Sequence, residues 1–175
     1  MNAAATPAPP RVVVLAWGNP SRGDDALGPS FLEAAEALAS RAGGDFAFVT
    51  DFQLQPEHAT DLLQRDLALF VDASRDLLEP IALREVTPRR DATFTTHGMS
   101  ADAVLAAYVA AFGDAPPPAF ELAIRGERFE LGAKMSPPAC EALSTAIHLF
   151  KRLAAQPTAV AWRRLTCGAA VVTAD

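Results

Sequence analysis

The sequence predicts a single α/β domain, a three-layer α/β/α sandwich with a twisted, mixed but mostly parallel sheet of about five strands. Half of the 175 residues are hydrophobic, and most of these are aliphatic or alanine. The apolar runs at 12–17 and 67–71 have the length of strands and are continuous, which is typical of strands buried on both faces. Amphipathic helical patterns alternate with such runs along most of the chain, which favours a mostly parallel sheet.

Each element follows from a local pattern. The strands are expected at 11–17, 46–51, 67–71, 81–86 and 120–124, and the helices at 28–42, 56–64, 101–112 and from 136 onward. Residues 81–86 alternate between apolar and charged side chains, which indicates an edge strand. Ser100 and Ser136 are suited to begin helices, and Gly113 to end one.

The expected domain spans residues 11–156. Residues 1–10 are rich in alanine and proline and are expected to be disordered. Residues 157–175 have no clear periodicity, and we expect a flexible C-terminal tail.

Composition excludes several classes of protein. The net charge is −6 with both signs interspersed, unlike the basic surface of a nucleic-acid-binding protein. The run 12–17 is too short to cross a bilayer and has no signal-peptide flanks. Cys140 and Cys167 lie far apart, as expected for two thiols in a reducing compartment. We therefore expect a cytoplasmic protein without a nucleic-acid or membrane partner.

The most informative segment is 18–28, Gly-Asn-Pro-Ser-Arg-Gly-Asp-Asp-Ala-Leu-Gly, which connects the first strand to the first helix. Phosphate-binding turns use backbone N–H groups and often a lysine, and this turn matches neither G-x-G-x-x-G nor G-x-x-x-x-G-K-[ST]. It presents two adjacent carboxylates instead. That chemistry suits a metal ion or a proton better than a nucleotide.

Acidic residues are also expected at the carboxyl ends of the next two strands. In open α/β sheets, ligands bind beyond the carboxyl ends of the strands. Asp24 and Asp25 follow the first strand, Asp51 ends the second and Asp72 ends the third, and His97 lies in the loop before the helix at 101–112.

Asp25, Asp72 and His97 are the candidate site. Two carboxylates and an imidazole suit a borderline divalent ion such as nickel, zinc or cadmium, and without metal they could act as acid and base. Asp24 is an additional catalytic candidate, because closely spaced carboxylates raise one pKa. The alternatives are that the aspartates cap turns and that His97 is a surface residue.

Two other reactive side chains are not assigned to the site. His58 follows Glu57 on a short helix and is expected to be solvated. Cys140 lies in the last helix and is expected to be a small packing residue rather than a nucleophile.

The turn resembles the signature G-N-x-x-x-x-D-[DE]-[GA]-x-G of the [NiFe]-hydrogenase maturation endopeptidases. The family's other two metal-contacting positions match Asp72 in Phe-Val-Asp-Ala and His97 in Thr-His-Gly-Met-Ser. Segment 51–58 is similar to that of proteases serving soluble, NAD-linked hydrogenases. The similarity runs over residues 11–153. The sequence departs from the family at two positions of the turn. Ala26 stands where many members have glycine, and Asp25 stands where several have glutamate, whose side chain is one methylene longer.

The resemblance implies an endopeptidase that removes the C-terminal extension of a nickel-loaded [NiFe]-hydrogenase large-subunit precursor. Asp25, Asp72 and His97 would then contact nickel carried by the substrate, with no organic cofactor. Two alternatives stay open at this point. The trio could hold a metal tightly in a general metallopeptidase, or the protein could be a non-catalytic metal checkpoint that docks on the precursor.

Overall fold

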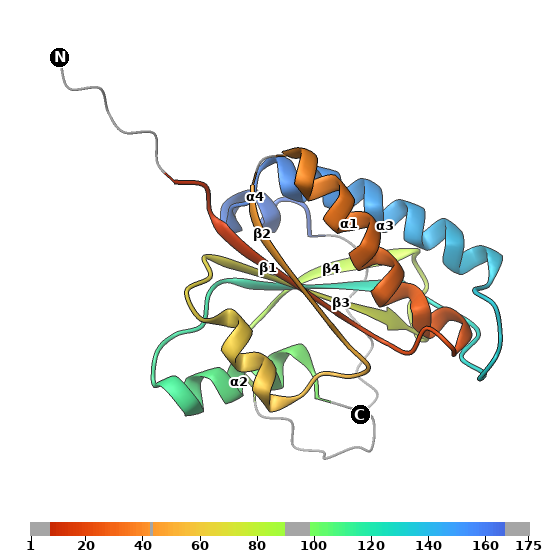
Figure 1. Ribbon diagram of the computed structural model, residues 1–175, viewed down its shortest axis with the longest axis horizontal. Helices are drawn as coiled ribbons and strands as arrows, with labels where there is room; N and C mark the ends of the chain where they lie inside the picture. Colours follow the sequence, from red (N-terminus) through yellow and green to blue (C-terminus); the bar gives the residue numbers. More distant parts are fainter. Residues whose placement is uncertain (1–7, 43, 90–98, 167–175) are drawn as a thin grey trace.

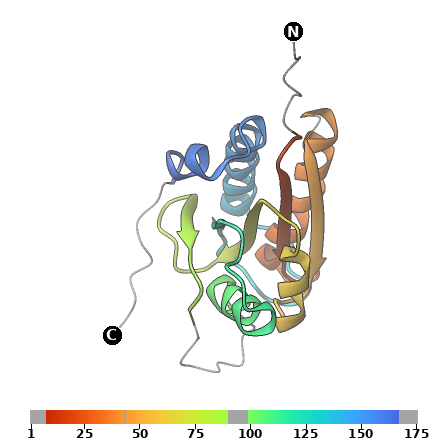
Figure 2. The ribbon, with the colours of Figure 1, turned by 90° about the vertical axis from the view of Figure 1, so that its left-hand side faces the viewer.

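The computed structural model describes residues 8–42, 44–89 and 99–166. One five-stranded sheet lies between two helical layers, as Figures 1 and 2 show. The strands are β1 (Arg11–Trp17), β2 (Asp45–Asp51), β3 (Leu67–Ser74), β4 (Ile81–Val86) and β5 (Ala119–Arg125). The α-helices are α1 (Leu27–Ala42), α2 (Ala101–Phe112), α3 (Pro137–Ala155) and α4 (Ala159–Arg163), with 3-10 helices η1 (Gly23–Ala26) and η2 (Pro56–Leu62). The predicted α/β/α sandwich is therefore confirmed.

The sheet has the strand order β2-β1-β3-β5-β4. The pairs β1–β2, β1–β3 and β3–β5 are parallel, and β4 runs antiparallel to β5 at the edge. The mixed, mostly parallel sheet and the edge position of residues 81–86 agree with the sequence pattern. The carboxyl ends of β1 and β3 point to the right-hand side of Figure 1.

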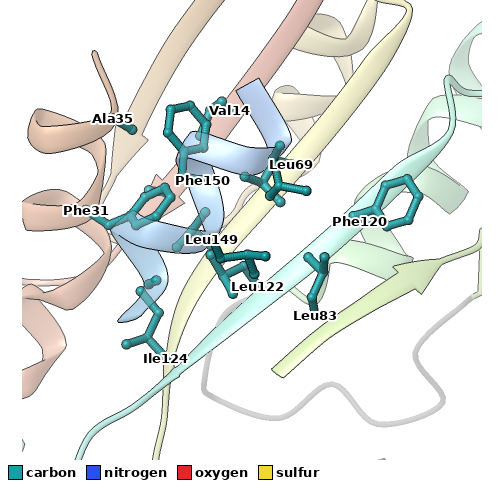
Figure 3. Close-up of a cluster of buried hydrophobic side chains, with 14 of the residues drawn as sticks. Val14, Phe31, Ala35, Leu69, Leu83, Phe120, Leu122, Ile124, Leu149 and Phe150 are labelled. Atoms are coloured by element: carbon teal, nitrogen blue, oxygen red, sulfur yellow. The ribbon is translucent and has the colours of Figure 1, made fainter. Parts of the chain in front are cut away.

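Alternate residues of the strands pack into two hydrophobic cores. On one face, Val12 and Val14 of β1 contact a cluster that includes α1, α3 and Trp162. Figure 3 shows this cluster, in which Phe31 of α1 meets Phe150 of α3 edge to face with ring centroids 5.6 Å apart. On the other face, Val13 and Leu15 belong to a second cluster with η2 and α2. A continuous apolar run is required because β1 is buried on both faces.

The sequence determines where α2 and α3 begin and where α2 ends, because a serine can satisfy free backbone N–H groups at a helix start and a glycine can end a helix. The Ser100 hydroxyl accepts from the Ala103 N–H at 3.2 Å, and the Ser136 hydroxyl accepts from the Ala139 N–H at 3.3 Å. Gly113 ends α2 with a left-handed φ of 73°, which glycine adopts without steric cost. The predicted starts of both helices and the end of α2 are thus confirmed.

The expectation of a flexible tail from Pro157 is wrong for residues 158–165. Thr158 caps the start of α4, and Trp162 within the helix is completely buried. The Trp162 indole N–H donates to the Leu153 carbonyl at 3.0 Å, and its ring meets Phe120 at a centroid distance of 5.4 Å. A helix of five residues has too little periodicity to be recognised from sequence, and one large aromatic residue anchors it.

The remaining domain predictions are not tested. Residues 1–7 and 167–175 lie outside the described part of the chain, so the expected disorder there and the start of the domain at residue 11 stay predictions. Within residues 8–42, 44–89 and 99–166, none of the helices combines the length and apolar character that crossing a membrane requires.

Candidate active site

The turn after β1 folds back tightly against the end of that strand. Gly18 has a φ of 139°, and a Cβ atom there would collide with the backbone carbonyl of Asp25. A Cβ atom on Gly28 would collide with the carbonyl of Trp17. Glycine is therefore required at both ends of the turn. This close approach holds η1, with its two aspartates, at the carboxyl edge of the sheet.

Asp25 is partly exposed at this edge. Its Oδ2 atom accepts a hydrogen bond from the Asn19 N–H at 2.9 Å, across the turn. The backbone N–H of Asp25 donates to the Arg22 carbonyl at 3.1 Å. The turn thus fixes the orientation of the Asp25 carboxylate and leaves it partly open to solvent.

Asp72 lies within β3, since this strand continues to Ser74 rather than ending at Asp72 as expected. Its side chain faces the same side of the sheet as Phe70, toward the second core. Burial raises the pKa of the Asp72 carboxyl to about 7, and the hydrogen bond from the Ala73 N–H opposes this rise. The negative charges of Glu121 and Asp25 raise the pKa further. The structure thus brings Asp25 and Asp72 close enough to interact.

Glu121 is a site neighbour that the sequence reasoning missed. It lies opposite Phe70 in the β3–β5 register, and therefore on the same face as Asp72. Its Oε2 atom accepts from Nε of Arg84 at 2.6 Å, and Arg84 also binds Asp102 of α2 at 2.9 Å. Burial raises the pKa of Glu121, although the Arg84 charge opposes the rise. A glutamate inside an otherwise apolar strand was the signal that could have revealed it.

Asp24 has a structural environment that differs from that of Asp25. It is completely buried, and its carboxylate accepts hydrogen bonds from the N–H groups of Glu127, Arg128 and Ser136, at 2.6–2.9 Å, and from the Ser136 hydroxyl at 2.7 Å. Burial alone would raise the pKa of Asp24, but these hydrogen bonds together hold it below the ordinary value. All four interactions are within the protein, which favours a structural role over the additional catalytic one.

His97 lies outside the described residues, so the predicted trio is not tested as a unit. Met99, two residues later, donates its N–H to the Leu54 carbonyl at 3.4 Å, beside the loop that follows β2. Among the residues that the structure describes, no three His, Cys, Asp or Glu side chains form a group that could hold a metal ion. The metal site therefore stays a prediction.

Two expectations about side chains outside the trio are wrong. His58 is buried rather than solvated: its Nδ1 atom accepts from the Gln55 N–H at 2.9 Å, and its Nε2 atom lies 3.6 Å from Asp51. Cys140 is exposed rather than packed. The Gln55–His58 capping interaction at the start of η2 fixes the orientation of the histidine ring.

The fold and the carboxylate pair place the chain among α/β/α proteins with a candidate site at the carboxyl edge of a mostly parallel sheet. No family model matches the sequence. No match is found among the curated proteins either.

The solved structures that resemble this fold include several hydrogenase maturation proteases. The [NiFe] hydrogenase maturation protease HycI from Thermococcus kodakarensis is 21% identical, with a TM-score of 0.64 over 82% of this chain and 92% of that chain. The hydrogenase maturating endopeptidase HybD from E. coli is 17% identical, with a TM-score of 0.59 over 79% and 88%. A hydrogenase 3 maturation protease is 25% identical, with a TM-score of 0.55 over 82% and 88%. These likenesses show that the chain has the fold of these proteases.

Proposed function

We propose that this protein is an endopeptidase that removes the C-terminal extension of a nickel-loaded [NiFe]-hydrogenase large-subunit precursor. The observation that carries the proposal is that Asp25 and Asp72 lie close enough to influence each other's charge, at the carboxyl edge of a fold that resembles that of hydrogenase maturation proteases. The glycine-bounded turn that presents Asp25 contains the motif that resembles the signature of those enzymes.

In the proposed mechanism, nickel is part of the substrate. Asp25, Asp72 and His97 contact the nickel ion of the precursor, and the substrate's own ligands complete its coordination. The two aspartates repel each other when both are charged, and burial disfavours the charged form of Asp72. A nickel ion bound between the two carboxylates offsets both their mutual repulsion and the cost of burying a charged Asp72. Nickel then serves as the recognition element and as the Lewis acid that polarises the scissile carbonyl.

The finer assignments follow the same resemblance. Segment 51–58 supports a precursor from a soluble, NAD-linked hydrogenase as the substrate. The two widely spaced cysteines support action in a reducing compartment, the cytoplasm. The partner is then the precursor alone, with neither a nucleic acid nor a membrane required.

The test is incubation of the purified protein with nickel-loaded and nickel-free precursor, followed by intact mass spectrometry. We expect loss of one C-terminal peptide from the nickel-loaded form only. A precursor that already lacks the extension is the matched control and should keep its mass. Equal cleavage of both forms contradicts nickel recognition and favours a general metallopeptidase. Stable binding of the nickel-loaded form without any loss of mass favours the checkpoint alternative.

The metal content of the purified protein gives a second, independent test of whether the substrate supplies the nickel or the protein is a general metallopeptidase. If the substrate supplies nickel, the purified protein holds less than stoichiometric metal, and a chelator does not slow cleavage of a fully loaded precursor. A general metallopeptidase instead retains its metal, and a chelator inhibits it. Elemental analysis of the protein and a cleavage assay with the chelator measure both quantities.

A further inference from the structure

Three large apolar side chains stand out on the surface. Leu78 is 85% exposed, Leu131 74% and Phe52 68%, the highest values among the large hydrophobic residues that the structure describes. Phe52 follows β2, Leu78 follows β3 and Leu131 follows β5, so all three lie on loops at the carboxyl edge of the sheet. Single exposed apolar residues are normal, but their concentration at one edge indicates an interaction surface.

The loop that carries Leu78 is bonded to the start of the β5–α3 loop. The Arg125 N–H donates to the Pro80 carbonyl at 3.0 Å, and the Arg125 guanidinium donates to the Leu78 carbonyl at 3.2 Å. Arg75 also lies over the Phe129 ring, with its guanidinium carbon 4.4 Å from the ring centroid. The β3–β4 loop is therefore tied to residues 125–129, and the Leu78 backbone to Arg125 directly.

The loop that carries Leu131 is bonded in turn to the β1–η1 turn. The Gly132 N–H donates to the Ser21 carbonyl at 2.7 Å, and the Asp24 N–H donates to the Arg128 carbonyl at 2.6 Å. The Asp24 carboxylate also accepts hydrogen bonds from the N–H groups of Glu127 and Arg128. Both leucines are thus held on one hydrogen-bonded surface before any partner arrives. Such preorganisation reduces the entropy lost on binding.

The charges around the two leucines favour a protein as the partner. The loops at 75–80 and 125–134 contain four basic residues (Arg75, Arg125, Arg128 and Lys134) and four acidic ones (Asp76, Glu79, Glu127 and Glu130). Mixed charge around apolar anchors is typical of the polar rim of a protein interface, whereas nucleic acids and anionic membranes require a basic surface. The same surface continues to Asp25 through the turn and to Asp72 through β3.

We propose that the loops at 75–80 and 125–134 form a preorganised docking platform for the folded body of the large-subunit precursor, anchored by Leu78 and Leu131. This inference rests on the proposed function, because the precursor must place its C-terminal segment at Asp25 and Asp72. The platform binds the precursor next to the segment that is cut. It contributes to affinity and leaves the bond-breaking step unchanged.

The test is single-turnover cleavage of nickel-loaded precursor by Leu78→Asp, Leu131→Asp and the double variant. Each leucine is mostly exposed, so the variants should fold, and Leu78→Ser and Leu131→Ser are milder replacements should either fail to fold. The protease concentration that gives half-maximal rate should rise about tenfold for each single variant, with the maximal rate unchanged. Val160→Asp is the control, because Val160 is 59% exposed on α4, beside the amino edge of the sheet, and should leave both quantities unchanged.

The outcomes separate the platform from the proposed function. If the unaltered protein cuts the precursor and the leucine variants match it at every concentration, the platform is disproved while the function stands. An effect of Val160→Asp equal to that of the leucine variants also overturns the platform. If the unaltered protein neither binds nor cuts the nickel-loaded precursor, the proposed function and the platform fail together.

Discussion

The Asp24 carboxylate accepts hydrogen bonds from both the backbone N–H and the hydroxyl of Ser136, a residue 112 positions further along the chain. The same hydroxyl accepts from the Ala139 N–H at the start of α3. One buried charge therefore joins the β1–η1 turn to the first turn of α3. Asp24 and Asp25 are adjacent in the sequence but perform separate tasks: Asp24 holds the loops together, and Asp25 is presented at the edge.

Asp24→Asn should destabilise the fold. An asparagine keeps one acceptor oxygen but turns an N–H₂ group toward N–H donors, which leaves buried groups unsatisfied. We expect the free energy of unfolding to fall by at least about 3 kcal/mol, measured by urea denaturation. Asp76→Asn, at an exposed aspartate in the β3–β4 loop, is the matched control and should unfold like the unaltered protein. An unchanged midpoint for Asp24→Asn would contradict the structural role.

Asp25→Asn should have the opposite profile, with a normal melting temperature and lost activity. Asp25 is partly exposed and has one hydrogen bond that an asparagine oxygen can replace. Removing its charge removes a metal contact or acid/base group, so we expect the cleavage rate to fall by at least about 100-fold. Asp25→Glu restores the charge at a longer reach and should retain more activity than Asp25→Asn. The reverse order of these two variants would show that charge at this position is not what matters.

The sequence predicts the sheet well because its pattern is strong. The bounds of β1 and β4 agree with the expected ranges, since a run buried on both faces and an alternating edge strand are distinct patterns. The position of Asp25 follows from the turn that separates β1 from α1. These features depend on residues that are close together in the chain.

Features that depend on distant backbone groups could not be predicted. The role of Asp24 comes from N–H donors in the β5–α3 loop, and backbone donors leave no mark in the sequence. The orientation of His58 depends on its capping interaction with Gln55, and the surroundings of Asp72 depend on the β3–β5 register that places Glu121 nearby. Residue identity alone cannot show these relationships.

Trp162→Ala tests whether the C-terminal helix belongs to the fold. Trp162 is fully buried against Phe120, and its indole N–H is hydrogen-bonded, so its truncation leaves a cavity in the first core. We expect the free energy of unfolding to fall by about 3–5 kcal/mol. Val160→Ala on the exposed side of the same helix should change it by less than about 0.5 kcal/mol. If residues 158–165 were a flexible tail, neither substitution would change the free energy of unfolding.

Asp72→Asn should stabilise the protein in a pH-dependent way. The pKa of Asp72 is about 7 in the folded protein, against an ordinary value of 3.8. Between these values the folded state binds a proton that the unfolded state has lost, so the free energy of unfolding decreases as the pH rises, and the full penalty is present above pH 7. The asparagine variant avoids this penalty and keeps an oxygen for the Ala73 N–H.

At pH 8 we therefore expect Asp72→Asn to be more stable than the unaltered protein by about 1–3 kcal/mol, a value reduced for the partial exposure of the side chain. The difference should shrink as the pH falls through 7 and disappear near pH 4, where the carboxyl is protonated in the folded state. Thermal unfolding of both proteins across this range measures it, with Asp76→Asn as the control. A difference that is constant with pH would show that Asp72 does not titrate in this window. The Asp72→Asn variant should not process the precursor. A protein is expected to keep a destabilising buried carboxylate such as Asp72 where its function requires the charge.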